Sequence, residues 1–221
     1  MKKIKKVILF THDKYQKNKD IIKLSAFLKR KKIDTEILLQ SSKNVKLIST
    51  GENLQPSSKI NTTSLKSYGL IIVFGGDGLF LSASKFAYFL NIPILGINFG
   101  KIGFLVDVDK KDILKKVYEI IMGDYIIDKR MLIDANVQDA NDNKITSTSL
   151  NDIVVYNYGL LKMIQAKIYI NNFLVNIQRS DGVIISTPTG STAYSMSNGC
   201  PIVSPDAKVI SITPISPHTY S

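Results

Sequence analysis

The sequence has a single cysteine, Cys200, and no run of apolar residues long enough to cross a membrane. One cysteine excludes an internal disulfide and a cysteine-based metal cluster, and it is typical of a reducing compartment. A membrane helix needs about 18 consecutive apolar residues. The basic N-terminal stretch MKKIKK leads into an apolar run that is too short for a signal peptide. We therefore expect a cytoplasmic protein.

Several motifs of nucleotide-binding and hydrolytic enzymes are also absent. No G-x-x-x-x-G-K-[ST] occurs, and the glycines of GINFGKIG at 96–103 do not have the G-x-G-x-x-G spacing. These absences exclude a P-loop and a standard Rossmann fingerprint. A Ser/His/Asp hydrolase is disfavoured because no G-x-S-x-G occurs and only His12 and His218 could supply the base.

The chain has few arginines, so its formal charge of +11 comes almost entirely from lysine. The lysines are scattered over the N-terminal third and residues 110–116, without interleaved aromatic residues. This pattern disfavours direct nucleic-acid binding. It fits a solvated lysine-rich surface, whose field would also attract polyphosphate substrates.

The first half of the 221-residue chain alternates strand-like and helix-like segments. Strands are predicted at 7–10, 35–39, 70–74 and 94–97, and helices at 17–31 and 79–90. Residues 41–64 are polar, and we interpret them as a loop. This alternation predicts a Rossmann-like α/β domain with a mostly parallel sheet, over residues 1–107.

The second half has a different pattern. A connecting helix is predicted at 109–122, ending at Gly123, and strands follow at 132–137, 150–156, 164–170, 173–178 and 183–186. Asn171-Asn172 is a plausible hairpin turn, because asparagine tolerates a positive φ. We expect residues 108–221 to form the connecting helix and a second, β-rich domain.

The stretch IIVFGGDGLFL at 71–81 places one carboxylate among three glycines after a buried strand. Consecutive glycines at the carboxyl end of a parallel strand let a phosphate approach the backbone closely. Asp77 would repel that phosphate unless it held a cation or accepted a proton, and both roles suit phosphoryl transfer. The structural alternative is a simple Gly-Asp turn that caps the strand.

Two further segments carry polar groups after predicted strands. Asn98 and Gly100 follow the strand at 94–97, so a second glycine-rich turn is expected at the sheet edge. The segment TPTGSTAYS at 187–195 groups hydroxyls around Gly190, with Tyr194 offering a flat face for a base. A Ser/Thr-rich surface loop would have the same composition.

In this order, the segments resemble the ATP-dependent NAD kinases. The matching words are GGDG at 75–78, N-x-G-x-x-GFL at 98–105, KRML at 129–132, LND at 150–152, RSDG at 179–182, TPTGSTAYS at 187–195 and P-H-x-x-S at 217–221. Lipid kinases carry a similar GGDG, so the specific part of the resemblance is TPTGSTAYS.

The resemblance implies transfer of the ATP γ-phosphate to the 2′-hydroxyl of the adenosine ribose of NAD, which gives NADP. Asp77 would be the general base. The two glycine-rich turns would bind phosphate, through Gly75, Gly76, Gly78, Asn98 and Gly100. The implied NAD-binding residues are Asp77, Gly78, Asn151, Asp152, Lys162, Arg179, Asp181, Thr192, Ala193, Tyr194, Ser195, Met196 and Ser197. A divalent ion, Mg²⁺, would be held mainly by the ATP phosphates, and no dedicated metal ligands are expected. The family also implies a homo-oligomer, a dimer or tetramer.

Two departures from the family leave alternatives open. Leu79 stands where the family commonly has Thr or Asn after GGDG. Family members usually continue beyond a segment such as 217–221, so one alternative is a nucleotide-binding, NAD kinase-like fragment without efficient turnover. A lipid kinase is a further alternative, disfavoured by the TPTGSTAYS segment and by the lack of an obvious apolar acyl-binding segment.

Overall fold

The computed structural model describes residues 3–41, 45–49, 65–99, 103–106, 108, 110–157, 159 and 163–218, and only the backbone of 45–49. The chain divides into two compact units, Met1–Ile127 and Asp128–Ser221. No helix within the described ranges is long and apolar enough to span a membrane.

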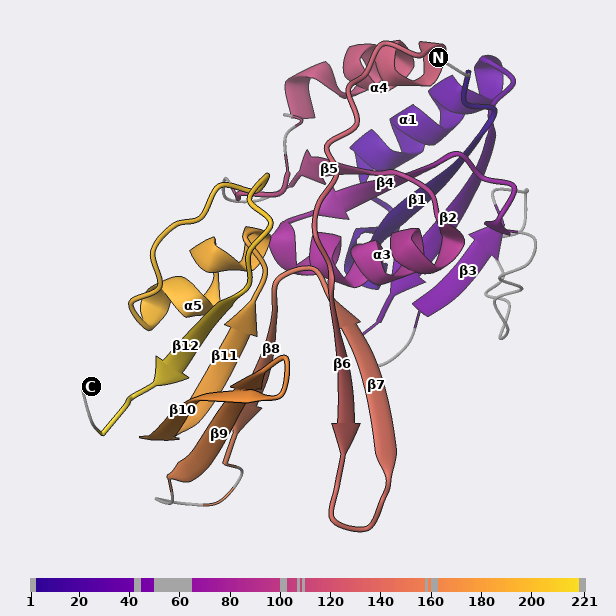
Figure 1. Ribbon diagram of the computed structural model, residues 1–221. Helices are drawn as coiled ribbons and strands as arrows, with labels where there is room; N and C mark the ends of the chain where they lie inside the picture. The colour runs from indigo at the N-terminus through magenta and orange to yellow at the C-terminus, as the bar shows by residue number, and fades with distance from the viewer. Residues whose placement is uncertain are drawn as a thin grey trace. The chain divides into compact units, whose positions relative to one another are not determined.

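The first unit is a three-layer α/β fold (Figure 1). Its elements are β1 (Lys6–His12), η1 (Asp13–Tyr15), α1 (Lys19–Arg30), β2 (Asp34–Gln40), β3 (Val45–Ser49), β4 (Leu70–Gly75), α3 (Asp77–Leu90), β5 (Ile94–Asn98), η2 (Lys110–Asp112) and α4 (Ile113–Met122). The sheet has the order β3-β2-β1-β4-β5, and β2, β1, β4 and β5 are parallel. Figure 1 shows α1 and α4 on one face of this sheet and α3 on the other. The predicted Rossmann-like architecture is confirmed.

The helices follow from apolar spacing and from their end residues. Ile21, Leu24 and Leu28 form the buried face of α1, and the Asn18 side chain accepts the Asp20 N–H at its start. In α4 the buried positions are Ile113, Val117 and Ile121, four residues apart. Gly123 ends α4 in the left-handed region, with φ of 106°, as the sequence predicts.

The boundary between the two units lies at 127/128, whereas the sequence led us to expect 107/108. The difference arises because α4 packs against the first sheet. Its buried residues Ile113, Val117 and Ile121 join the same core as Leu24 of α1 and Phe74 of β4. The connecting helix is therefore part of the first unit.

The expectation of a loop over 41–64 is wrong for Val45–Ser49. These residues form β3 and pair antiparallel with Glu36–Gln40 of β2. Val45 and Ile48 favour strands, and with Leu47 they suffice for an edge strand, although the surrounding residues are polar and typical of a loop. Residues 42–44 and 50–64 lie outside the described part of the chain.

The second unit is β-rich, as predicted. It comprises β6 (Ile133–Gln138), β7 (Lys144–Ser149), β8 (Asp152–Tyr156), β9 (Ile164–Ile170), β10 (Phe173–Ser180), β11 (Gly182–Ser186), η3 (Thr189–Thr192), α5 (Tyr194–Ser197) and β12 (Ser211–Ile215). Strands β12, β11 and β8 form an antiparallel sheet, while β6-β7 and β9-β10 are hairpins. Asn171 and Asn172 have φ of 49° and 70° and join β9 to β10, which confirms the predicted turn.

Candidate functional site

The glycine turn of the first unit sits where β4 ends and α3 begins. All six residues of β4 are buried, Gly76 is the N-cap of α3, and Asp77 is the first residue of that helix. A carboxylate in the first turn of a helix is stabilised by the unpaired N–H groups there. The local fold therefore presents the Asp77 carboxylate at the carboxyl edge of the sheet.

Two backbone N–H groups hold this carboxylate. Phe104 donates to Asp77 Oδ2 across 2.9 Å, and Leu105 donates to Oδ1 across 3.3 Å. Gly103, the residue before them, lies so close that a Cβ atom there would overlap the Asp77 carboxylate. The GFL part of the second motif thus builds a cradle for the aspartate of the first, which a simple capping turn would not need.

The two glycine-rich turns meet at one edge of the sheet. Gly75 at the end of β4 lies opposite Asn98 at the end of β5, and Phe99 donates its N–H to the Gly75 carbonyl across 3.4 Å. Both strands are parallel, so both turns lie at the carboxyl edge, which is where open α/β sheets bind ligands. Gly100, also predicted to bind phosphate, lies outside the described residues.

In the second unit, the LND and TPTG segments are bound tightly to each other. Thr187 donates its N–H to the Asn151 carbonyl across 2.8 Å and its hydroxyl to the Leu150 carbonyl across 2.6 Å. The Thr187 hydroxyl also accepts the Gly190 N–H at 3.2 Å. A Cβ atom at Gly190 would overlap the Asn151 backbone. Glycine is therefore required at 190 by close packing.

The side chains of Asn151 and Asp152 both lie where a further polar partner would stabilise them. The Asn151 Oδ1 atom is buried and has no hydrogen-bond partner. Burial raises the pKa of the Asp152 carboxyl, since the charged form loses solvation. A buried orphan acceptor and a partly desolvated carboxylate are both costly to folding, and such costs are concentrated at functional sites.

The TPTGSTAYS segment is not a solvated surface loop. Thr187, Thr189, Ser191 and Ser195 of this segment are all buried, as is Ser186 just before it. The Ser195 hydroxyl donates to the Ser186 hydroxyl across 2.8 Å, and the Ser191 hydroxyl donates to the Pro188 carbonyl across 2.7 Å. Several of these hydroxyls are thus used internally and hold the segment in a fixed shape.

The other residues predicted to bind NAD lie on this segment or near it in the second unit. Thr192 ends η3, Ala193 follows it, and Tyr194, Ser195, Met196 and Ser197 form α5, with Tyr194 and Met196 nearly half exposed. Arg179, near the end of β10, and Asp181, between β10 and β11, are exposed on either side of buried Ser180. Lys162 lies outside the described residues.

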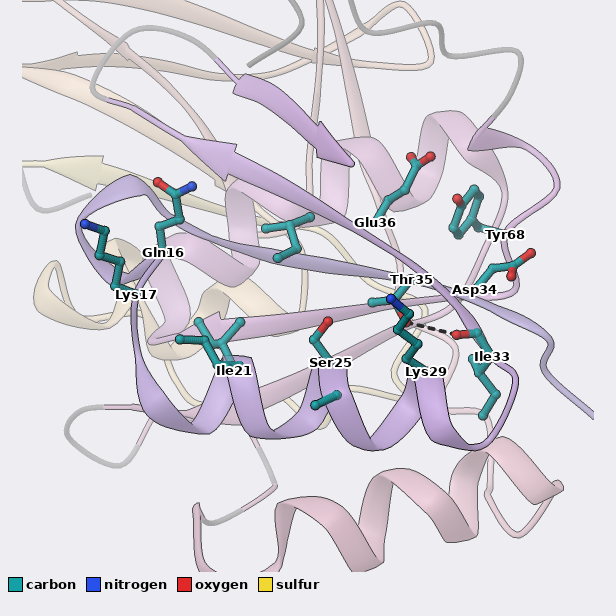
Figure 2. Close-up of a pocket in the computed structure, with 13 residues that line it drawn as sticks. Gln16, Lys17, Ile21, Ser25, Lys29, Ile33, Asp34, Thr35, Glu36 and Tyr68 are labelled. Atoms are coloured by element: carbon teal, nitrogen blue, oxygen red, sulfur yellow. Dashed lines mark hydrogen bonds between the residues drawn. The ribbon is translucent and has the colours of Figure 1, made fainter. Parts of the chain in front are cut away.

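A large cavity lies in the first unit, and none of its described lining residues belongs to the glycine turns. It has a volume of about 700 Å³ and is lined by residues of α1 and β2, with Tyr68 (Figure 2). Figure 2 shows Ser25 and Lys29 rising from α1 toward β2. Burial and the neighbouring Glu36 carboxylate raise the pKa of the Tyr68 phenol. No residue of the predicted site lines this cavity, so its size does not make it the candidate site.

Metal ligands do not cluster in the described part of the chain. It contains no group of three or more His, Cys, Asp or Glu side chains arranged to hold a metal ion.

Comparison with known proteins matches each of the two units to a domain of one family. Residues 12–125 match the model of the ATP-NAD kinase N-terminal domain, and residues 150–221 match that of the ATP-NAD kinase C-terminal domain. The chain is 43% identical over 152 residues to an NAD kinase of Teredinibacter turnerae, covering 69% of this chain and 52% of that protein. It is 40% identical over 200 residues to an NAD kinase of Clostridium perfringens, covering 86% of this chain and 70% of that protein.

Solved structures agree in fold. The yeast NADH kinase complexed with NADH superposes with a TM-score of 0.81 at 22% identity, covering 100% of this chain and 68% of that one. An Archaeoglobus fulgidus NAD kinase in complex with ATP gives 0.71 at 20% identity, covering 98% of this chain and 74% of that one. The chain spans about half to two thirds of the length of the first curated relatives it matches. Its two matched domains and its identity to these relatives show that the chain belongs to the ATP-NAD kinase family.

Proposed function

We propose that this chain transfers the γ-phosphate of ATP to the 2′-hydroxyl of the adenosine ribose of NAD, giving NADP. The observation that carries the proposal is the Asp77 carboxylate, held at the carboxyl edge of the sheet by the N–H groups of Phe104 and Leu105. Each carboxylate oxygen retains a lone pair beyond its backbone hydrogen bond, so the group can still accept a proton. The family assignment supports the same reaction.

In this reaction Asp77 accepts the proton of the ribose 2′-hydroxyl. The hydroxyl oxygen bonds to the γ-phosphorus while the bond from that phosphorus to the β,γ-bridging oxygen breaks, and ADP leaves. A bound Mg²⁺, held mainly by the ATP phosphates, would neutralise their charge. Gly75, Gly76, Gly78, Asn98 and Gly100 would bind phosphate.

The second unit supplies nucleotide recognition in this proposal. Asn151 and Asp152 suit ribose hydroxyls, because an amide and a carboxylate together donate and accept hydrogen bonds. Arg179, Asp181, Lys162 and residues 192–197 would complete the NAD contacts. The buried hydroxyls of the TPTGSTAYS segment support this role, because they keep the exposed Tyr194 in a defined place.

The proposal includes a homo-oligomer, a dimer or tetramer, in the cytoplasm. The β9-β10 hairpin carries a set of half-exposed or more exposed apolar side chains: Tyr169, Ile170, Phe173, Leu174, Val175 and Ile177. An apolar ribbon of this kind is typical of a surface that another chain or segment covers. Sedimentation equilibrium of the purified chain measures the association directly. The single cysteine supports the cytoplasmic part of the proposal, because it fits a reducing compartment.

The test is NADP formation from NAD, ATP and Mg²⁺ by this chain, with Asp77→Asn beside it. Asparagine can still accept the Phe104 N–H but cannot take the proton, so the rate should fall about a hundredfold or more. Asp142→Asn is the matched control, because Asp142 lies in the exposed β6-β7 turn with φ of 61°, which asparagine tolerates. Chelation of the metal should abolish turnover, and added Mg²⁺ should restore it.

Two outcomes would contradict parts of this proposal. Equal rates of NADP formation in the wild type and Asp77→Asn would show that Asp77 takes no part in the phosphoryl transfer. No NADP from the wild type, despite calorimetric binding of NAD, would leave a nucleotide-binding, NAD kinase-like protein without turnover. A lipid kinase is not proposed, because both family models are those of ATP-NAD kinases.

A further inference from the structure

An aromatic pair is built onto the glycine turn of the first unit. Tyr15 of η1 follows β1, and Phe99 follows β5, and their rings meet edge to face with centroids 6.2 Å apart. The Phe99 ring also packs on Phe74 at 5.3 Å, and its N–H donates to the Gly75 carbonyl. Strand β4 lies between β1 and β5, so the pair spans the end of the strand that leads into Asp77.

A lysine ammonium group lies over each ring of this pair. Lys14 Nζ lies 4.9 Å from the centroid of the Tyr15 ring, and Lys110 Nζ lies 4.8 Å from the centroid of the Phe99 ring. Cation–π contacts of this length are attractive but weak at an exposed site. They restrict where the ammonium groups lie, and the N–H donors remain available to an anion. We call Lys14, Tyr15, Phe99 and Lys110 the edge cation cluster.

The acidic groups closest in sequence to this cluster are partly engaged. The Asp13 carboxylate contacts His12 Nδ1 and also accepts the Lys14 N–H at 2.7 Å. A hollow of about 220 Å³ beside Lys110 is lined by four lysines and two aspartates: Lys23, Lys110, Lys111, Lys115, Asp20 and Asp112. Lysine outnumbers aspartate in this hollow, so the local field at the carboxyl edge attracts anions.

We propose that Lys14 and Lys110, positioned by the Tyr15–Phe99 pair, bind the polyphosphate tail of the phosphoryl donor. The proposal rests on the proposed function and adds the residues that hold the donor. A triphosphate needs several positive groups along its length, and the cluster places two ammonium groups at the strand ends next to the glycine turn. ATP and inorganic polyphosphate share this chemistry, so the subsite suits both.

The chain offers a matched control for a lysine that sits on an aromatic ring. Lys31 Nζ lies 4.9 Å from the centroid of the Tyr118 ring and 5.8 Å from that of Phe27. Lys31 follows the C-terminal end of α1, which is at the opposite end of the parallel sheet from the carboxyl edge. Lys31→Gln therefore removes the same charge and the same kind of contact without touching the proposed subsite.

The experiment compares the wild type, Lys14→Gln, Lys110→Gln, the double variant and Lys31→Gln. The KM values for ATP and NAD are measured separately, and binding of sodium tripolyphosphate is measured by calorimetry on the full chain. We expect the double variant to raise the ATP KM and weaken tripolyphosphate binding about tenfold, with an unchanged NAD KM. Lys31→Gln should behave as the wild type. Long-chain inorganic polyphosphate, tested as donor in place of ATP, should show the same rise in KM if it uses the subsite.

The outcomes separate this subsite from the proposed function. If NADP is formed and the double variant keeps the wild-type ATP KM, or raises both KM values equally, the subsite is wrong and the function stands. If tripolyphosphate binding is lost in the double variant but the wild type forms no NADP, the subsite stands and the function is wrong. Failure of the wild type to bind tripolyphosphate overturns the subsite. If the double variant raises the KM for inorganic polyphosphate but not the KM for ATP, the ATP tail is excluded as the ligand of this subsite.

Discussion

The backbone N–H of Phe104 donates to Asp77 Oδ2 across 2.9 Å, between residues of two different sequence motifs. Leu105 adds a second N–H to the other carboxylate oxygen at 3.3 Å. A carboxylate with both oxygens held by backbone donors has a fixed orientation, which is a requirement for proton transfer at a defined atom. The GFL part of the N-x-G-x-x-GFL motif therefore orients the Asp77 carboxylate.

The first prediction concerns the glycine that makes this arrangement possible. In Gly103→Ala the new methyl group would overlap the Asp77 carboxylate, so either the carboxylate or the 103–105 backbone must move. Misplacing a catalytic group by about 1 Å can cost about a hundredfold in rate. We expect the rate of NADP formation to fall at least tenfold, measured in the same assay as Asp77→Asn.

Gly159→Ala is the control for this substitution. Among the described residues, a Cβ atom at Gly159 would meet nothing closer than Asn157 Oδ1 at 3.4 Å, which is an ordinary contact. Its thermal melting temperature and activity should match the wild type. Full activity in Gly103→Ala would show that the position of the carboxylate seen here is not needed for turnover.

The second prediction concerns the packing between the LND turn and the TPTG segment. In Gly190→Ala the methyl group would overlap the Asn151 backbone on both its carbonyl and its Cα atom. Overpacking of this kind costs typically 1–3 kcal/mol. We expect a loss of about that size in the free energy of unfolding, measured by urea denaturation, and weaker NAD binding by calorimetry.

Thr187 allows the hydrogen bonds of the same contact to be tested without added volume. Thr187→Val keeps the side-chain shape but loses the bonds to Leu150 and Gly190, which should cost about 1 kcal/mol or more and raise the NAD KM. Thr187→Ser keeps the hydroxyl and should restore the NAD KM. If Val and Ser behave alike, the hydroxyl does not position Asn151.

Much of this fold follows from local sequence. The spacing of Ile21, Leu24 and Leu28 predicts α1, and the apolar runs predict β1, β4 and β5. Strands β7 and β12 were not predicted, because KITSTS and SITPI hold few apolar residues and are specified by pairing with a neighbour. The assignment of α4 to the first unit depends on tertiary packing of Val117 and Ile121, which no local pattern reveals.

The sequence proposes the residues of the candidate site but does not give their geometry. The glycines around Asp77 indicate a phosphate-binding turn, yet nothing local links Asp77 to the Phe104 N–H 27 residues later. Likewise, the composition of TPTGSTAYS by itself favours a solvated Ser/Thr-rich loop. Only the fold shows that Ser191 and Ser195 are buried and that Thr187 binds the LND backbone.

The third prediction follows from the raised pKa of Asp152, which burial causes. A carboxyl whose folded pKa lies above its unfolded value disfavours folding once it is ionised, so stability falls as the pH rises through that range. Asp152→Asn removes the charge. We expect a higher melting temperature than the wild type at pH 7, a difference that shrinks toward pH 3, and an NAD KM raised about tenfold. A lower melting temperature at pH 7 would contradict this account.

The last prediction concerns Tyr68, whose pKa is raised by burial and by the Glu36 carboxylate, to which it is also hydrogen-bonded. An unfolded tyrosine ionises near pH 10. The folded chain holds this proton to a higher pH, so its contribution to stability is complete below about pH 10 and decreases as the pH rises further. In Tyr68→Phe this alkaline loss should be smaller, and the lost hydrogen bond should cost about 1 kcal/mol at pH 7.

Urea denaturation at pH 7, 9, 10 and 11 measures both effects, with Tyr169→Phe, a change on an exposed strand, as the control. An identical alkaline decline in the wild type and Tyr68→Phe would mean that Tyr68 ionises alike in both states, and that the Glu36 contact does not hold its proton.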